Sequence, residues 1–281
     1  MKRIPLLLLA TTLWAGAAAA QYRGPRSADH LFATSTWGAP ALWVNPLALA
    51  NVDEASLMLE AMVERDPDER YPLAQYTIGF NSRGFGFGFR HDTFHVPAPD
   101  GDSLISVGGN TWRLGLGRGL GRLAIGAAVS LYSGADKQQD VDLGLRYVIA
   151  RGLNVAIGVE HIGQPTVRDS SLRFGGAVGL SWTVATGVVG LDAEVRAHDR
   201  ETGNGFLVGY RGGLRIRTPG RLPVAATGVI ELDDGFDVRR VLLGLAVGAD
   251  YLASLVAGGR ENGSNTLTTA SLRAQASRRF R

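Results

Sequence analysis

The stretch "RGFGFGFRH", residues 83–91, decides the fold class of this chain because its residues alternate by size. Three phenylalanines alternate there with three glycines, at Phe85, Phe87, Phe89, Gly84, Gly86 and Gly88. On a helix the rings would scatter around the cylinder, whereas on a strand successive side chains point to opposite faces. The stretch therefore predicts a strand with a wall of rings on one face and bare backbone on the other, which would let another segment approach closely.

The same alternation recurs along most of the chain. In "VDLGLRYVI", residues 141–149, apolar side chains oppose Asp142, Gly144 and Arg146. "SLRFGGAVGLSWT", residues 171–183, and "VVGLDAEVR", residues 188–196, repeat the pattern. About fourteen such runs are predicted strands. Their approximate spans are 56–64, 72–81, 84–94, 110–118, 121–133, 139–150, 153–163, 171–183, 187–199, 204–218, 222–233, 236–249, 251–260 and 266–280.

The connections between these runs alternate in length. Short ones such as "NSRG" (81–84) alternate with longer polar ones such as "ERDPDERYP" (64–72). Short turns at one end and longer loops at the other are typical of an outer-membrane barrel, and in lipid only a closed sheet pairs all its backbone groups. We therefore predict an all-β fold, a transmembrane antiparallel β-barrel of about fourteen strands over residues 56–281. A secreted β-sandwich also alternates and is the alternative, but the apolar face recurs on nearly every run.

The N-terminus predicts export. Lys2 and Arg3 precede a short apolar run, and Ala18-x-Ala20 forms a cleavage site before Gln21, so residues 1–20 are the predicted signal peptide. The chain has no cysteine and so does not rely on disulfides. Its formal net charge of +3 gives no case for nucleic acid. The predicted location is the outer membrane.

Residues 21–55 do not alternate, and their prolines and short apolar run favour a segment that folds into the barrel as a plug. Within it, "ALWVNPLALANVDEASL", residues 41–57, resembles the N-terminal motif of the FadL-type barrels, which include the PorV-like and PorQ-like outer-membrane proteins. Trp43, Asn45, Pro46, Leu49 and Ala50 match that motif, whereas Leu47 and Ala48 stand where the family usually has Ala and Gly.

This resemblance implies passive passage of a hydrophobic or amphipathic small molecule, which binds in the lumen beside the plug motif Trp43, Asn45, Pro46 and Leu49. It also implies sideways release through a wall opening near a kinked third strand, here the run that holds Gly84, Gly86 and Gly88. The PorV-like branch implies instead a structural or secretion-partner barrel without transport. The expected partners are outer-membrane lipid and a hydrophobic small molecule, or secretion and surface proteins under the alternative.

Charged residues of both signs fall on the predicted inward face. They are Glu60, Arg113, Arg122, Asp142, Arg146, Glu160, Asp192, Glu194, Arg196, Arg211, Arg215, Arg217, Glu231 and Arg273. One interpretation is a structural ladder of ion pairs across strands. The other is a ligand site, for which Arg211, Arg215 and Arg217 are the predicted anionic head-group residues because they share one face of one strand.

Other chemistry has no clear pattern. His91 and His95 do not predict a metal site, and the acidic loops lack the EF-hand spacing. No spacing singles out a nucleophile with a base, so we predict neither an enzyme nor a cofactor. A general ion-conducting porin is the third interpretation, and the predicted plug weighs against it.

Overall fold

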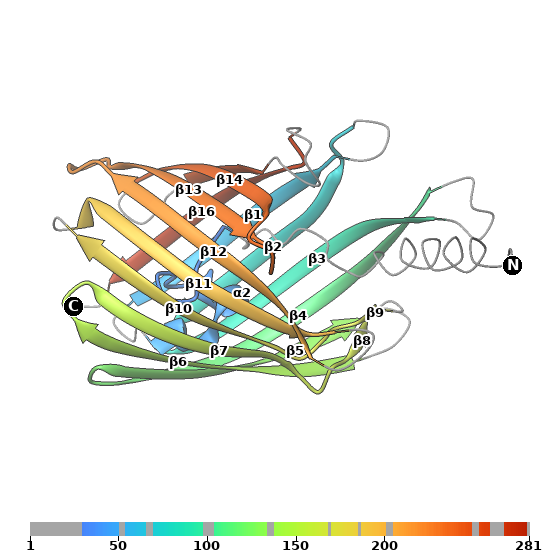
Figure 1. The fold of residues 1–281 in the computed structure, drawn as a ribbon, viewed down its shortest axis with the longest axis horizontal. Helices are drawn as coiled ribbons and strands as arrows, with labels where there is room; N and C mark the ends of the chain where they lie inside the picture. The colour runs from blue at the N-terminus through green and yellow to red at the C-terminus, as the bar shows by residue number, and fades with distance from the viewer. Residues whose placement is uncertain are drawn as a thin grey trace, which may run out of the picture.

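The structure, a computed structural model, contains a closed barrel of fourteen antiparallel strands (Figure 1). It describes residues 30–50, 54–65, 70–97, 104–133, 138–167, 170–184, 187–200, 205–248, 253–258 and 267–279. The barrel closes because the first strand, β1, pairs with both β2 and the last strand, β16. The predicted signal peptide 1–20 lies outside the described residues.

Every predicted run corresponds to a barrel strand, so the prediction of an all-β barrel is confirmed. The barrel strands are β1 Glu54–Glu64, β2 Leu73–Ser82, β3 Phe85–Pro97, β4 Leu104–Leu120, β5 Leu123–Ser133, β6 Gln138–Ala150, β7 Leu153–Ile162, β10 Gly175–Val184, β11 Val189–Asp199, β12 Phe206–Arg217, β13 Val224–Leu232, β14 Val238–Val247, β15 Ala253–Gly258 and β16 Thr269–Arg279. A separate two-stranded hairpin, β8 Thr166–Val167 and β9 Ser170–Ser171, lies between β7 and β10 in the sequence.

Two elements differ from the sequence prediction. Strand β4 begins at Leu104 rather than near residue 110, because its first residues continue the antiparallel pairing with β3 as far as Pro97. That stretch lacks clear alternation, so pairing rather than pattern extends the strand. The β8–β9 hairpin has only two residues in each strand, and all but Ser171 lie between the predicted strands 153–163 and 171–183.

The outer face is apolar all around the barrel. Phe85 and Phe87 are exposed on it, as are Leu59, Trp112 and Leu145. The Phe89 ring lies 4.5 Å from the Trp112 ring, measured between centroids. The phenylalanines of residues 83–91 therefore face outward, as their alternation predicts. In the part of the chain that the structure describes, no helix is both long enough and apolar enough to cross a membrane.

The described part of the predicted plug segment, residues 30–50, lies inside the barrel (Figure 1). It forms a short helix, α2 (Ala41–Val44), and a 3-10 turn, η1 (Pro46–Ala50). Leu42, Leu47 and Leu49 have no exposed surface, and η1 contacts β4, β5 and β6. We call residues 30–50 the inner segment.

Glycines form the surface on which the inner segment rests. Four of them are cross-strand neighbours in a continuous row, Gly117, Gly126, Gly144 and Gly158, from β4 to β7. A side chain at Gly126 would overlap the main chain of Pro46 and Leu47, and one at Gly144 would overlap the Asn45 side chain. The same holds on the neighbouring strands, where Cβ atoms at Gly79, Gly86, Gly88 and Gly115 would crowd Ala39, Leu42, Trp43 or Leu49. We call these eight glycines the glycine seat.

The replacement of Gly126 by alanine tests this seat. A methyl group there overlaps backbone atoms that cannot rotate away, so Gly126→Ala should lower the free energy of unfolding by about 1–3 kcal/mol, as overpacking does. Denaturant unfolding of the purified barrel, with limited proteolysis of the inner segment, measures this.

Gly228→Ala is the matched control, because a Cβ there meets only Leu243 Cδ2 at 3.9 Å. It should leave stability unchanged or slightly raised, since alanine restricts the unfolded chain more than glycine does. Equal effects of the two substitutions would contradict a specific seat.

Candidate functional site

The predicted plug motif lies at the centre of the glycine seat. The Trp43 ring lies against Gly88, where a Cβ would be 2.6 Å from Trp43 Cζ2, and Arg90 Cζ lies 5.0 Å from the centre of the ring. Leu49 packs against Gly86 and Gly115. The structure therefore brings these two side chains onto the bare backbone of β3 and β4.

Asn45 and Pro46 fix the bend between α2 and η1. The Asn45 side-chain oxygen accepts a hydrogen bond of 3.2 Å from the Leu47 main-chain nitrogen, which is a local turn typical of Asn before Pro. The same amide lies between Gly144 and Gly158. A Cβ at Gly144 would overlap this side chain and one at Gly158 would lie 3.3 Å from Asn45 Nδ2, so motif and wall are complementary.

The three glycines of the predicted wall opening lie in two different places. Gly84 occupies the tight turn between β2 and β3 with φ of +87°, a conformation that favours glycine. Gly86 and Gly88 face inward, and their space is filled by Leu42, Leu49 and Trp43. Strand β3 pairs without a register shift with β2 and with β4. The opening therefore stays a prediction, and the structure shows a filled and continuous wall at these residues.

Most inward charges are paired across strands. Arg273 contacts Glu60 at 3.2 Å and Arg240 contacts Glu231 at 2.9 Å across strands, whereas Arg90 contacts Asp92 at 3.3 Å within β3. These pairs are buried or half-buried, which is how charges persist in an interior. Arg122 differs from its predicted inward orientation, because it is exposed in the turn between β4 and β5.

The three predicted head-group arginines have different surroundings. Arg211 Nη1 contacts Glu194 at 3.0 Å, its Nε contacts Glu231 at 3.0 Å, and it also donates to the Leu31 carbonyl. Arg215 lies over Gly190, and Arg217 is half-buried at the last position of β12. Because Arg211 already holds two carboxylates and the inner segment, an anionic ligand at this trio stays a prediction.

The N-terminal end of the inner segment contacts charged residues of β11 and β16, on the other side of the barrel from the glycine seat. The Ala33 main-chain nitrogen donates to Glu194 Oε2 at 3.0 Å, and His30 Nε2 lies 3.0 Å from Arg273 Nη2. The Phe32 ring packs on Gly213, with Arg211 Cζ 4.7 Å from its centre. The inner segment therefore contacts charged strands at one end and the glycine seat at the other.

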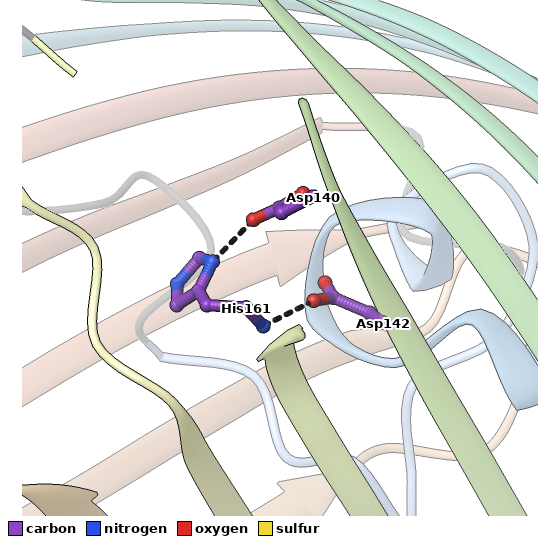
Figure 2. Close-up of side chains that lie close together, drawn as sticks. All are labelled: Asp140, Asp142 and His161. Carbon is purple, nitrogen blue, oxygen red and sulfur yellow. Dashed lines mark hydrogen bonds and ion pairs between the residues drawn. The ribbon is translucent and has the colours of Figure 1, made fainter. Parts of the chain in front are cut away.

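A buried polar network joins β4, β5, β6 and β7. Figure 2 shows the His161 ring turned toward Asp140, with Nδ1 2.5 Å from Oδ2, and the His161 main-chain nitrogen 2.8 Å from Asp142 Oδ1. Tyr132 Oη donates to Asp140 at 2.9 Å, and Arg113 forms an ion pair with Asp142. Asp140 and Asp142 thus each contact hydrogen-bonding groups of neighbouring strands.

This network arises from a bulge that the alternation does not predict. The register between β6 and β7 shifts between Val141 and Leu143, and His161 has φ of +57°. The extra residue turns His161 inward beside Asp140 and Asp142. The sequence shows only neighbouring polar residues near a strand end, which is why this cluster was missed.

Asp140, Asp142 and His161 are also the one group of three metal-type ligands found among the described residues, with ligand atoms within 4.8 Å of one another. The Arg113 cation on Asp142 opposes a second cation there. The geometry therefore favours a hydrogen-bonded network that stabilises the wall, and the absence of a metal stays a prediction.

A double-mutant cycle tests this network. Asp142→Asn leaves Arg113 as a buried charge without its carboxylate, so it should lower the free energy of unfolding by about 3–5 kcal/mol. The single variant Arg113→Met and the double variant Arg113→Met/Asp142→Asn complete the cycle, and the double variant, which removes both charges, should cost clearly less than the two single changes added together. Denaturant unfolding in detergent measures all four proteins, and strictly additive effects would argue against the pair.

These features define a class of protein. A closed fourteen-stranded barrel with an apolar exterior and an N-terminal segment packed inside it has the architecture of an outer-membrane β-barrel.

Comparisons with solved structures agree with this class. CymD, a monoaromatic hydrocarbon channel, aligns with a TM-score of 0.54 and 10% identity, over 88% of this chain and 94% of that chain. The toluene transporter TodX of Pseudomonas putida gives 0.50 and 11%, over 87% and 94%. A FadL homologue of Pseudomonas aeruginosa gives 0.52 and 10%, over 86% and 94%. No protein-family model and no curated protein sequence matches this chain. At these identities the likeness shows the fold.

Proposed function

We propose that this chain is an outer-membrane barrel for passive passage of hydrophobic or amphipathic small molecules, which bind beside the inner segment and leave through the wall. The observation that carries this proposal is the glycine seat, where a buried apolar segment fills the lumen against bare backbone. A water-filled pore for ions is disfavoured because the inner segment and paired charges occupy the space. The fold shared with CymD and TodX supports the choice of hydrophobic solutes.

The glycine seat also supports lateral exit. Along β3 to β7 seven glycines of the seat carry no side chain on the inner face, and the inner segment packs against their bare backbone. On the outer face of β4 to β7 lies an apolar hollow of about 520 Å³, lined by side chains that include Leu116, Ile125, Leu143 and Ile157. If the inner segment leaves its seat, a solute at Gly86, Gly88 or the Gly117–Gly158 row would lie against bare backbone, with only the outward side chains of neighbouring residues beyond it.

The proposal includes how the chain sits in the membrane. The end with the turns 83–84, 121–122 and 151–152, called here the short-turn end, would face the periplasm, because short periplasmic turns are typical of these barrels. Both β1 and β16 have their free ends there, since Glu54 pairs with Arg279. Export by a signal peptide over residues 1–20 and a plug over residues 21–55 belong to the same proposal.

A second candidate function is a structural or secretion-partner barrel of the PorV-like kind. The uninterrupted pairing of β3 and the paired charges of the lumen favour it. Under this candidate the inner segment is a permanent part of the wall. The two candidates therefore differ in whether the inner segment must move.

A reversible cross-link between the inner segment and β1 separates the two candidates. The chain has no cysteine, and a Cβ at Gly38 would lie 3.4 Å from Ser56 Cβ, close to the spacing of about 3.5–4.5 Å found in disulfides. Cells of a Gram-negative host without channels of this type would carry Gly38→Cys/Ser56→Cys, and uptake of labelled toluene would be measured. We expect uptake to fall to the empty-vector level when the pair is oxidised and to recover on reduction.

The single variant Gly38→Cys is the control, because it carries the same strain at φ of +72° without a cross-link. Unchanged uptake by the oxidised double variant would show that the inner segment need not move. No uptake above the empty vector by the unmodified chain would overturn the transport proposal and favour the second candidate.

A further inference from the structure

One buried arginine of the lumen differs from the others. The structure describes five arginines as buried, at Arg90, Arg113, Arg146, Arg211 and Arg273. Four of them contact a carboxylate. Arg146 has no such contact with any described carboxylate. An unpaired buried charge is unfavourable, and it is a reason to look for a ligand.

The surroundings of Arg146 leave its donors unused. Its side chain points inward from β6, between Ala124 of β5 and Ala156 of β7, which are its cross-strand neighbours. Arg146 is 6% exposed, and its Nε and Nη1 atoms are buried without a hydrogen-bond partner among the described residues. Its two cross-strand neighbours therefore offer no side-chain acceptor to a guanidinium that can donate several hydrogen bonds.

Trp37 covers this guanidinium. Arg146 Cζ lies 3.6 Å from the centre of the Trp37 ring, which is cation–π contact. Trp37 is 41% exposed, so its other side faces open space. The indole of Trp37 therefore shields Arg146 from the open space on its other side. Among the described residues, no hydrogen bond of the ring fixes it in this position.

The pair lies near the short-turn end of the barrel. Arg146 is four residues before the end of β6, and Ala124 is the second residue of β5. Asn154 lies two pairs further toward that end, opposite Val148, and its side-chain amide donates a hydrogen bond of 3.4 Å to Ser181 Oγ. An anion bound to Arg146 would lie on the mouth side of the glycine seat, beside Gly144.

We propose that Arg146 and Trp37 form a binding site for a carboxylate carried on an aromatic or other apolar body. The guanidinium would bind the carboxylate in a bidentate manner, and the indole would pack against the apolar part. The cross-strand neighbours of Arg146, Ala124 and Ala156, are small and bring no competing charge to the head group. This inference rests on the proposed function, in which small molecules pass through the barrel. The site would lie on their path, at the mouth on the short-turn side.

Binding of benzoate to the purified full-length barrel tests the proposal, read by tryptophan fluorescence. Loss of a charge-assisted hydrogen-bonded pair should weaken binding of benzoate to Arg146→Met by at least about tenfold. The same variant should keep or raise its thermal midpoint, because it removes an unpaired buried charge. Arg240→Met is the matched control, since Arg240 already contacts Glu231 and its loss should leave benzoate affinity unchanged.

Three further ligands define the chemistry. Benzyl alcohol has the ring without the charge, acetate has the charge without the ring, and inorganic phosphate is a free anion. We expect each to bind at least about tenfold more weakly than benzoate to the unmodified barrel. Equal binding of acetate or phosphate would overturn the amphipathic ligand and leave a small-anion site. Unchanged benzoate affinity in Arg146→Met, or a lowered thermal midpoint with unchanged affinity, would show a purely structural arginine.

Uptake of toluene by the unmodified barrel is a separate measurement. Benzoate binding that depends on Arg146, in a barrel that takes up no toluene, would leave this site intact and overturn the transport proposal. Toluene uptake with no benzoate binding would do the reverse.

Discussion

Backbone hydrogen bonding in a medium without water is the constraint on which this structure depends. Each strand must form hydrogen bonds on both sides, so the sheet has to close, and β1 pairs with β16. Closure fixes two faces for every strand. The outer face carries large apolar side chains. The residues between them point into the lumen, and together with the inner segment they must fill that narrow space. The inner segment, the glycine seat and the ion pairs together fill the lumen.

The inner face is divided between two kinds of filling. Along β2 to β7 it presents the glycine seat, and the inner segment places Leu42, Leu47 and Leu49 there with no exposed surface. Along β11 to β16 it presents arginines and glutamates, and these hold the main chain of Leu31 and Ala33. Burial of apolar side chains fixes one end of the segment, and charged groups satisfy the polar atoms of the other. A segment of mixed character therefore has one stable orientation in this lumen.

Alternation in the sequence predicts which face each side chain takes, and this was enough for the strand count, the outward phenylalanines and the paired charges. It was also enough to expect close approach of a segment to the glycines of residues 83–91. It does not predict register, because register depends on how neighbouring strands are staggered around the barrel. The row from Gly117 to Gly158 is visible only when four strands are aligned. The bulge at His161 and the lack of a described carboxylate beside Arg146 depend on register in the same way.

The contrast between Arg113 and Arg146 shows why register carries the functional information. Both are inward arginines, and their sequence surroundings are alike. Arg113 reaches Asp142 two strands away, whereas the neighbours of Arg146 on both sides are alanines. A buried cation with a carboxylate stabilises the wall, and removal of either partner is costly. A buried cation without one costs stability, so its retention requires a compensating interaction. In this barrel the Trp37 ring supplies part of that compensation, and two guanidinium nitrogens without a partner among the described residues are where the proposed anion would bind.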